Sequence, residues 1–162
     1  MIIIISFWVN TLEGGRHVYE LKVVRERRAG YGQKRRFQSS TEIWQSFKEH
    51  FDRLDREHFL VLLLDAKNTF IGYNTVSIGT LTSSLVHPRE VFTAVFLEKA
   101  AAVIFMHNHP SGDPAPSAED IHITKRLRDI ADLIGVRVLD HIIFGCDKYI
   151  SFVDDGYMER VI

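Results

Sequence analysis

Stretches of continuous apolar residues alternate along the chain with stretches in which apolar residues recur at helical spacing. The run HFLVLLLD, from His58 to Asp65, is apolar at nearly every position, which is typical of a strand buried on both faces. After the turn Ala66-Lys67-Asn68, the segment FIGYNTVSIG (70–79) is predicted to return as the second strand of a hairpin. We expect both strands to lie centrally in one sheet, with further strands at 101–109, 137–145 and 149–152.

Three segments have the pattern of amphipathic helices. Ser39 and Glu42 have the spacing of a capped helix start, and the apolar positions after them recur every four residues, at Ile43, Phe47 and Phe51. A second helix begins at Pro88, and its large apolar inner face is expected to follow Val91, Phe92, Val95, Phe96 and Lys99. A third runs from about Ser117 to a stop at Gly135, with an expected inner face of Ile121, Leu127, Ile130, Leu133 and Ile134.

Because helices alternate with strands, the predicted fold is α/β (α+β), a mixed central sheet flanked by helices. The chain has 162 residues, of which 46% are apolar, which suits one sizeable core. Ahead of it we predict an amino-terminal arm, residues 1–38, with two or three short strands punctuated by Glu13-Gly14-Gly15 and Gly30-Tyr31-Gly32. Residues 39–162 then form the main domain.

Charge is unevenly distributed, although the net charge is only −1. Residues 1–50 contain nine Lys or Arg and five Asp or Glu, a balance of +4 that the rest of the chain offsets. The basic residues surround the glycines of AGYG and could contact nucleic-acid phosphates or form a solvated hairpin face: Lys22, Arg25, Arg27, Arg28, Lys34, Arg35 and Arg36. No groove-reading helix motif accompanies them.

The composition also argues against two classes of protein. The apolar opening MIIIISFWV is too short to span a bilayer and lacks the features of a signal peptide, so we expect a cytoplasmic protein without membrane contact. The single cysteine, Cys146, can form no internal disulfide and has no cysteine partner for a zinc finger.

The segment MHNHPSGDPAPSAED (106–120) contains a candidate metal site. His107 and His109 are two residues apart at the end of an apolar strand, so their side chains point to the same face. The loop after them, rich in proline and glycine, can fold the first helical turn, with Asp120, back over the strand end. Two neutral imidazoles and a carboxylate suit zinc, and three protein ligands leave a fourth position for water.

A plainer interpretation of the same segment is a capped helix. Ser117-Ala118-Glu119-Asp120 is a helix-start box, in which Ser117 caps the helix and Asp120 complements the helix dipole without binding anything. Capping explains these two residues. It does not explain two histidines on an apolar strand, where an unpaired imidazole is costly to bury.

The residues of this segment resemble a known family. His-x-His-Pro followed by Pro-Ser-x-x-Asp, at His107, His109, Pro110, Pro116, Ser117 and Asp120, resembles the JAMM (MPN) metalloprotease motif. The longer string HNHPSGDPAPSAED, with IGTLTSSLVHPREVF before it and VLDHIIFG after it, resembles the RadC family within that group over about residues 40–155. Many RadC-like proteins carry a helix-hairpin-helix region at the amino terminus, whereas this chain has the short basic arm, like the compact members found on mobile elements.

The resemblance implies a JAMM/MPN (cytidine-deaminase-like) fold and one Zn²⁺ held by His107, His109 and Asp120. It also implies that Ser117 helps to hold the developing oxyanion. The general base in this family is a glutamate at the start of an early core strand, for which Glu57 is the matching candidate and Glu90 the alternative.

Three functions are compatible with these features of the sequence. The leading one is a zinc-dependent hydrolase, of metallopeptidase or isopeptidase type, in which activated water attacks an amide carbonyl. The second is a DNA-associated, repair-related protein whose metal is structural or serves a phosphodiester reaction, and the third is an inactive binding module. The pair Asp140 and His141 could be a contact behind a metal ligand or a packed polar pair, and His122 is expected to point away from the ligands.

Overall fold

The computed structural model describes residues 3–12, 16–25, 35–79 and 86–159. The chain divides into two compact units, Met1–Gln33 and Lys34–Ile162. In the first unit, β1 (Ile3–Leu12) and β2 (Arg16–Arg25) form an antiparallel hairpin of two ten-residue strands, longer than the short strands that we predicted. The predicted turns at 13–15 and 30–32 lie outside the described residues.

The basic residues for which the sequence left nucleic-acid contact or a solvated hairpin face open are divided between the units. Lys22 and Arg25 lie on β2, and three others lie outside the described residues: Arg27, Arg28 and Lys34. Arg35 and Arg36 belong to the second unit and are exposed. Arg35 donates to Ser46 Oγ at 2.6 Å and Arg36 donates to Thr69 Oγ1 at 3.5 Å, so both guanidinium groups have partners within that unit.

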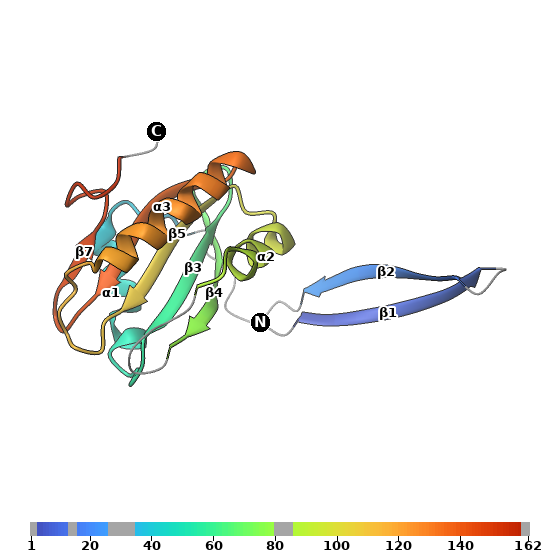
Figure 1. Ribbon diagram of the computed structural model, residues 1–162, viewed down its shortest axis with the longest axis horizontal. Helices are drawn as coiled ribbons and strands as arrows, with labels where there is room; N and C mark the ends of the chain where they lie inside the picture. Colours follow the sequence, from blue (N-terminus) through green and yellow to red (C-terminus); the bar gives the residue numbers. More distant parts are fainter. Residues whose placement is uncertain (1–2, 13–15, 26–34, 80–85, 160–162) are drawn as a thin grey trace. The chain divides into compact units, whose positions relative to one another are not determined.

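The second unit is built on a mixed five-stranded sheet (Figure 1). Its order is β4 (Phe70–Ile78), β3 (His58–Leu64), β5 (Ala102–Asn108), β6 (Arg137–Phe144) and β7 (Tyr149–Ser151). Only the β5–β6 pair is parallel within this sheet, and the other three pairs are antiparallel. The β3–β4 hairpin forms as predicted.

The expectation that both strands of this hairpin lie centrally is correct for β3 and wrong for β4. β3 has β4 on one side and β5 on the other, whereas β4 is the edge strand of the sheet formed by the described residues. The sequences explain the difference: Phe59–Leu64 are all buried, while β4 is only partly buried and its Tyr73 is 41% exposed. A strand with polar alternate positions suits an edge better than a centre.

Helices cover both faces of this sheet (Figure 1). On one face, α1 (Ser40–Phe51) packs against β6 and buries its predicted stripe of Ile43, Phe47 and Phe51 in one core cluster with Leu60 and Leu62 of β3. On the other face, α2 (Pro88–Glu98) packs over β3 and β4, α3 (Ala118–Leu133) packs over β6, and their buried residues form one core cluster with the remaining β3 residues. None of the helices in the described parts of the chain combines the length and apolar character that a membrane span requires.

The predicted inner faces of α2 and α3 are partly wrong. Phe96 on α2 is 60% exposed, and on α3 Ile121 is 41% and Leu133 86% exposed. The residues of α3 that are buried are Thr124, Leu127 and Ala131. Their spacing of three and four sets the inward stripe, and Leu133, about 200° around the helix from Ala131, falls on the solvent side.

Candidate metal centre

Two histidines meet at the carboxyl end of β5. His107, 1% exposed, is the penultimate residue of this strand, and His109 follows it. The backbone N–H of His109 donates to the Phe144 carbonyl on β6 at 2.9 Å, which keeps the chain extended past the strand end. Side chains two positions apart in an extended chain point to the same side. The two Nε2 atoms lie 3.0 Å apart, so the imidazoles converge as their spacing predicts.

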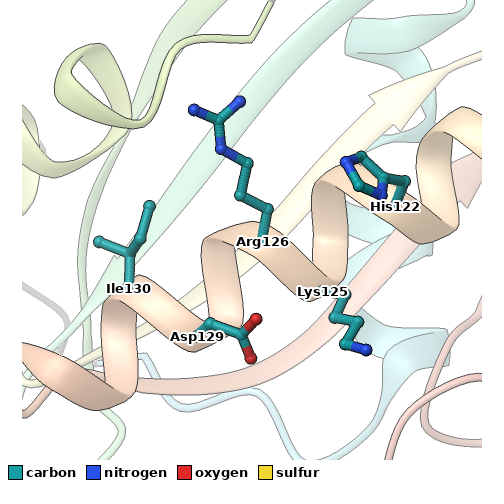
Figure 2. Close-up of a pocket in the computed structure, with 5 residues that line it drawn as sticks. All are labelled: His122, Lys125, Arg126, Asp129 and Ile130. Atoms are coloured by element: carbon teal, nitrogen blue, oxygen red, sulfur yellow. The ribbon is translucent and has the colours of Figure 1, made fainter.

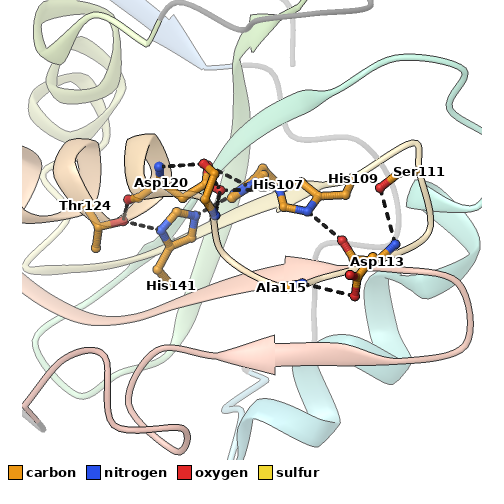
Figure 3. Close-up of polar contacts among 9 residues, drawn as sticks. His107, His109, Ser111, Asp113, Ala115, Asp120, Thr124 and His141 are labelled. Atoms are coloured by element: carbon orange, nitrogen blue, oxygen red, sulfur yellow. Dashed lines mark hydrogen bonds and ion pairs between the residues drawn. The ribbon is translucent and has the colours of Figure 1, made fainter.

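Asp120 joins them from the start of α3. Ser117 is the N-cap of this helix: its Oγ accepts from Asp120 N at 3.1 Å, and its own N–H donates to Asp120 Oδ2 at 2.7 Å. This capping box aims the carboxylate over the strand end, with Oδ1 3.2 Å from His107 Nε2 and Oδ2 3.5 Å from His109 Nε2. All three ligand atoms lie within 4.8 Å of one another, so the group could hold a metal ion (Figure 3).

The loop between β5 and α3 packs against the turn that follows β6. Gly112 has a φ of 82°, its N–H donates to the His109 carbonyl, and its own carbonyl accepts from Cys146 N, both at 2.9 Å. A Cβ added to Gly145 would lie 2.5 Å from the Gly112 carbonyl oxygen and 2.6 Å from Pro114 Cδ. Sequence reasoning missed Gly145, for which the only signal was a glycine directly after an apolar strand.

His109 is oriented by this loop. Its Nδ1 lies 2.7 Å from the Asp113 carbonyl oxygen (Figure 3). Because a carbonyl only accepts hydrogen bonds, Nδ1 carries a proton, and Nε2 of the neutral ring presents an electron pair to the group. The Asp113 carboxylate accepts from Lys148 Nζ at 3.2 Å and so ties the loop to the β6–β7 turn. Imidazole nitrogens and a carboxylate oxygen are a donor set that zinc accepts, so the residues present fit this metal.

Electrostatics favour a cation in the group. Burial alone would raise the pKa of the Asp120 carboxyl, but the His107 and His109 rings, when they carry a proton on Nε2, and the Ser117 hydroxyl hold this pKa well below its ordinary value. Burial lowers the pKa of His109, yet Asp120 and the Asp113 carbonyl outweigh that effect and raise it overall. The carboxylate is therefore ionised, and the group attracts positive charge.

Glu57 lies beside these residues. It immediately precedes β3, whose antiparallel register with β5 pairs Phe59 with His107. Glu57 lies two residues before Phe59, and His109 lies two residues after His107. Burial raises the pKa of the half-buried Glu57 carboxyl, and the neighbouring charges of His107 and Asp120 act on it in opposite directions.

Glu90, the alternative base, occupies a different environment. It lies in the first turn of α2, its side chain is 56% exposed, and its Oε1 is 3.1 Å from Nε of the adjacent Arg89. A carboxylate in the first turn also complements the helix dipole. Glu57 therefore lies near the candidate ligands, whereas Glu90 contacts the adjacent Arg89 at the start of α2.

The side chain of Ser117 is exposed and faces Asp120. Its Oγ donates to Asp120 Oδ2 at 2.6 Å, so this oxygen receives bonds from both the hydroxyl and the backbone N–H of Ser117. The residue is a helix cap that also orients a candidate ligand.

The structure separates the roles of Asp140 and His141, which the sequence left open. His141 is fully buried, and its Nε2 lies 2.8 Å from His107 Nδ1, directly behind a candidate ligand. Asp140 accepts hydrogen bonds from Ser151 Oγ at 2.6 Å and from Val153 N at 3.1 Å, and so organises the carboxyl-terminal turn.

His122 lies outside the group, in agreement with its spacing from Asp120. It is exposed and lines an open hollow along α3 together with Lys125, Arg126, Asp129 and Ile130 (Figure 2). This hollow contains none of the predicted site residues.

A mixed sheet between helices, with a His-x-His pair at a strand end and an aspartate from the next helix start, defines a domain of the JAB (MPN) type. A family profile described as "RadC-like JAB domain" matches residues 37–157, and the chain belongs to this family.

Curated relatives carry the name UPF0758 protein. Those of Geotalea uraniireducens and Pelobacter propionicus are 51% and 52% identical over 123 residues, which is 76% of this chain and 54% of each relative. That of Desulforamulus reducens is 56% identical over 103 residues, 64% of this chain and 45% of the relative. The chain thus spans about half the length of the curated relatives it matches.

Proposed function

We propose that this domain is a zinc-dependent hydrolase that cleaves a peptide or isopeptide bond. The observation that carries the proposal is the convergence of His107, His109 and Asp120 within 4.8 Å. The side chains of His109 and Asp120 are 17% and 14% exposed, so water and a substrate have access to the group. When bound, zinc supplies Lewis acidity toward the scissile carbonyl and lowers the pKa of a water molecule.

The hydrogen bonds indicate which atoms would hold the ion. Asp120 Oδ2 already accepts two bonds from Ser117, so we assign Oδ1, which lies 3.2 Å from His107 Nε2, as the carboxylate ligand. The Nε2 atoms of His107 and His109 supply the other two ligands. With three protein ligands, a bound zinc would keep a position open for water, as in catalytic zinc sites.

Glu57 is proposed as the general base that takes a proton from the attacking water and delivers it to the leaving nitrogen. Its raised pKa moves it toward the range in which a carboxylate exchanges protons near neutral pH. Asn108 fixes the backbone on both sides of Glu57, because its Oδ1 accepts from His58 N and its Nδ2 donates to the Arg56 carbonyl, both at 2.9 Å. This double contact provides the rigid support that a catalytic group needs.

Ser117 is proposed to stabilise the oxyanion that develops on the scissile carbonyl. Its exposed hydroxyl would rotate away from Asp120 Oδ2 and donate to the substrate oxygen. The backbone N–H of Ser117 would retain its bond to Oδ2, so Asp120 stays oriented during this rotation.

The test is hydrolysis of a library of peptide and isopeptide substrates by the zinc-loaded protein. Glu57→Gln is expected to reduce kcat by about 100-fold or more without loss of zinc, whereas Glu90→Gln should stay within about twofold of the wild type. The reverse pattern would refute the assignment of the base. A zinc-loaded wild type that cleaves no substrate would favour a binding module, and one that cleaves DNA instead would favour a DNA-associated protein.

A further inference from the structure

We propose that Thr124 and His141 are positioning residues that fix the tautomer of His107, so that its Nε2 electron pair faces the metal position. This inference deepens the proposed function because it concerns the same metal centre, but it requires only metal binding and not hydrolysis.

The side chains of Thr124, His141 and His107 form a continuous series of hydrogen bonds that ends at the candidate ligand His107 (Figure 3). Thr124 Oγ1 lies 2.5 Å from the carbonyl oxygen of Asp120, one helical turn earlier, and 2.6 Å from His141 Nδ1. His141 Nε2 in turn lies 2.8 Å from His107 Nδ1. Thr124, His141 and His107 are 3%, 0% and 1% exposed, so water cannot replace any of these bonds.

Each proton in this chain can be assigned from one fixed point, the Asp120 carbonyl. A carbonyl oxygen only accepts, so the hydroxyl proton of Thr124 is donated to it. Thr124 Oγ1 can then only accept from His141, which places a proton on His141 Nδ1. A neutral imidazole has one N–H, so His141 Nε2 accepts, and His107 Nδ1 must donate to it. The Nε2 of neutral His107 is left with an electron pair.

The surroundings of His141 keep it neutral. The aromatic rings of Phe59, Phe105 and Phe152 lie within 6 Å of its ring centroid, at 5.5, 5.9 and 4.7 Å. The His141 ring is 0% exposed among these apolar side chains, where a charged imidazolium would be costly to bury. A neutral His141 is what the proton assignment requires.

If these hydrogen bonds ran in the opposite direction, His107 could not bind the metal. It would place a proton on His107 Nε2, which would then donate to Asp120 Oδ1, 3.2 Å away, and could not bind a cation. It would also leave Thr124 Oγ1 and the Asp120 carbonyl as two acceptors 2.5 Å apart with no proton between them. Such a contact between two electron pairs is repulsive, so the geometry selects the first direction.

The inference is tested on the full chain, both metal-free and with Zn²⁺ alone as the probe. Nitrogen-15 NMR of the histidine rings at pH 8 reports which nitrogen of His107 carries the proton, and competition with a chromophoric chelator gives the zinc affinity.

Three variants are compared with the wild type. Thr124→Val removes the hydroxyl at nearly constant shape, Thr124→Ser retains the hydroxyl, and His141→Phe removes the second imidazole. Thr93→Val is the control, because Thr93 makes the same hydroxyl bond one turn back, to the Arg89 carbonyl at 2.7 Å, on α2.

We expect His107 to be protonated on Nδ1 in the metal-free wild type. Thr124→Val and His141→Phe should move this proton to Nε2 in part or wholly and weaken zinc binding by about 10- to 100-fold, whereas Thr124→Ser and Thr93→Val should stay within about twofold. A proton on His107 Nε2 in the metal-free wild type, or wild-type zinc affinity in Thr124→Val, would overturn the inference. If His141→Phe does not fold, Thr124→Val decides the outcome.

Failure of the proposed function gives a different result. A protein that binds zinc but hydrolyses nothing leaves both readouts intact. A protein that binds no zinc still reports the tautomer of His107, which then decides the inference alone.

Discussion

Replacing Gly145 by alanine should displace the loop that leads from His109 to Asp120. The added Cβ would lie 2.5 Å from the Gly112 carbonyl oxygen and 2.6 Å from Pro114 Cδ, whereas ordinary contacts begin at 3.4 Å. One of the two backbone segments must therefore move by about 1 Å, a displacement that typically costs about 100-fold in activity when it reaches a catalytic group. Zinc binding depends on the same loop, and we expect it to weaken by about tenfold.

Gly135→Ala is the matched control. Gly135 has a φ of 72°, so alanine is strained there by about 1–2 kcal/mol, but its Cβ would meet nothing within 4 Å. Gly135→Ala should thus lower the free energy of unfolding in urea and leave zinc affinity unchanged, whereas folded Gly145→Ala should bind zinc more weakly. Wild-type zinc affinity in folded Gly145→Ala, or equal weakening in both variants, would refute the role of this loop contact.

Three further predictions concern other parts of the second unit. Burial raises the pKa of Asp140 from 3.8 to about 6, so between these pH values the folded protein keeps a proton on this carboxyl that the unfolded chain has released. The free energy of unfolding should therefore fall by up to about 3 kcal/mol as pH rises through this window. Urea unfolding of wild type and Asp140→Asn measures this effect, and a difference between them that does not depend on pH would show that the pKa is not raised. Leu127→Ala should cost about 2–5 kcal/mol in urea unfolding and Leu133→Ala less than about 0.5 kcal/mol, because the first side chain is 0% and the second 86% exposed; equal costs would contradict the assigned inner face of α3. Asn108→Ala should lower kcat while zinc content is retained, because it releases the backbone on both sides of Glu57; unchanged kcat would show that this support is dispensable.

The elements and the candidate ligands were predictable because their signals are local. The buried run of β3, the stripe Ile43, Phe47 and Phe51, and the stop at Gly135 each depend on a few neighbouring residues. The same holds for two histidines at strand spacing. Their juxtaposition with Asp120 required one further step, a loop that reverses the chain, which the proline and glycine content indicated.

Residues that act through distant contacts could not be found in this way. Thr124 looks like any polar helical residue until α3 packs against β6 and places its hydroxyl 2.6 Å from His141. The role of Gly145 depends on a loop more than 30 residues earlier in the chain. The position of β4 at the sheet edge, and the exposure of Phe96 and Leu133, likewise depend on which elements pack together rather than on local spacing.

The central claim is that His107, His109 and Asp120 hold one zinc ion. Its most direct test is the zinc content, by elemental mass spectrometry, of purified wild type, His109→Ala and Asp120→Ala, with His122→Ala as the control from the exposed face of α3. We predict about one zinc per chain in the wild type and in His122→Ala, and little in the other two variants. Unchanged zinc content in both His109→Ala and Asp120→Ala, or none in a zinc-supplied wild type, would contradict it.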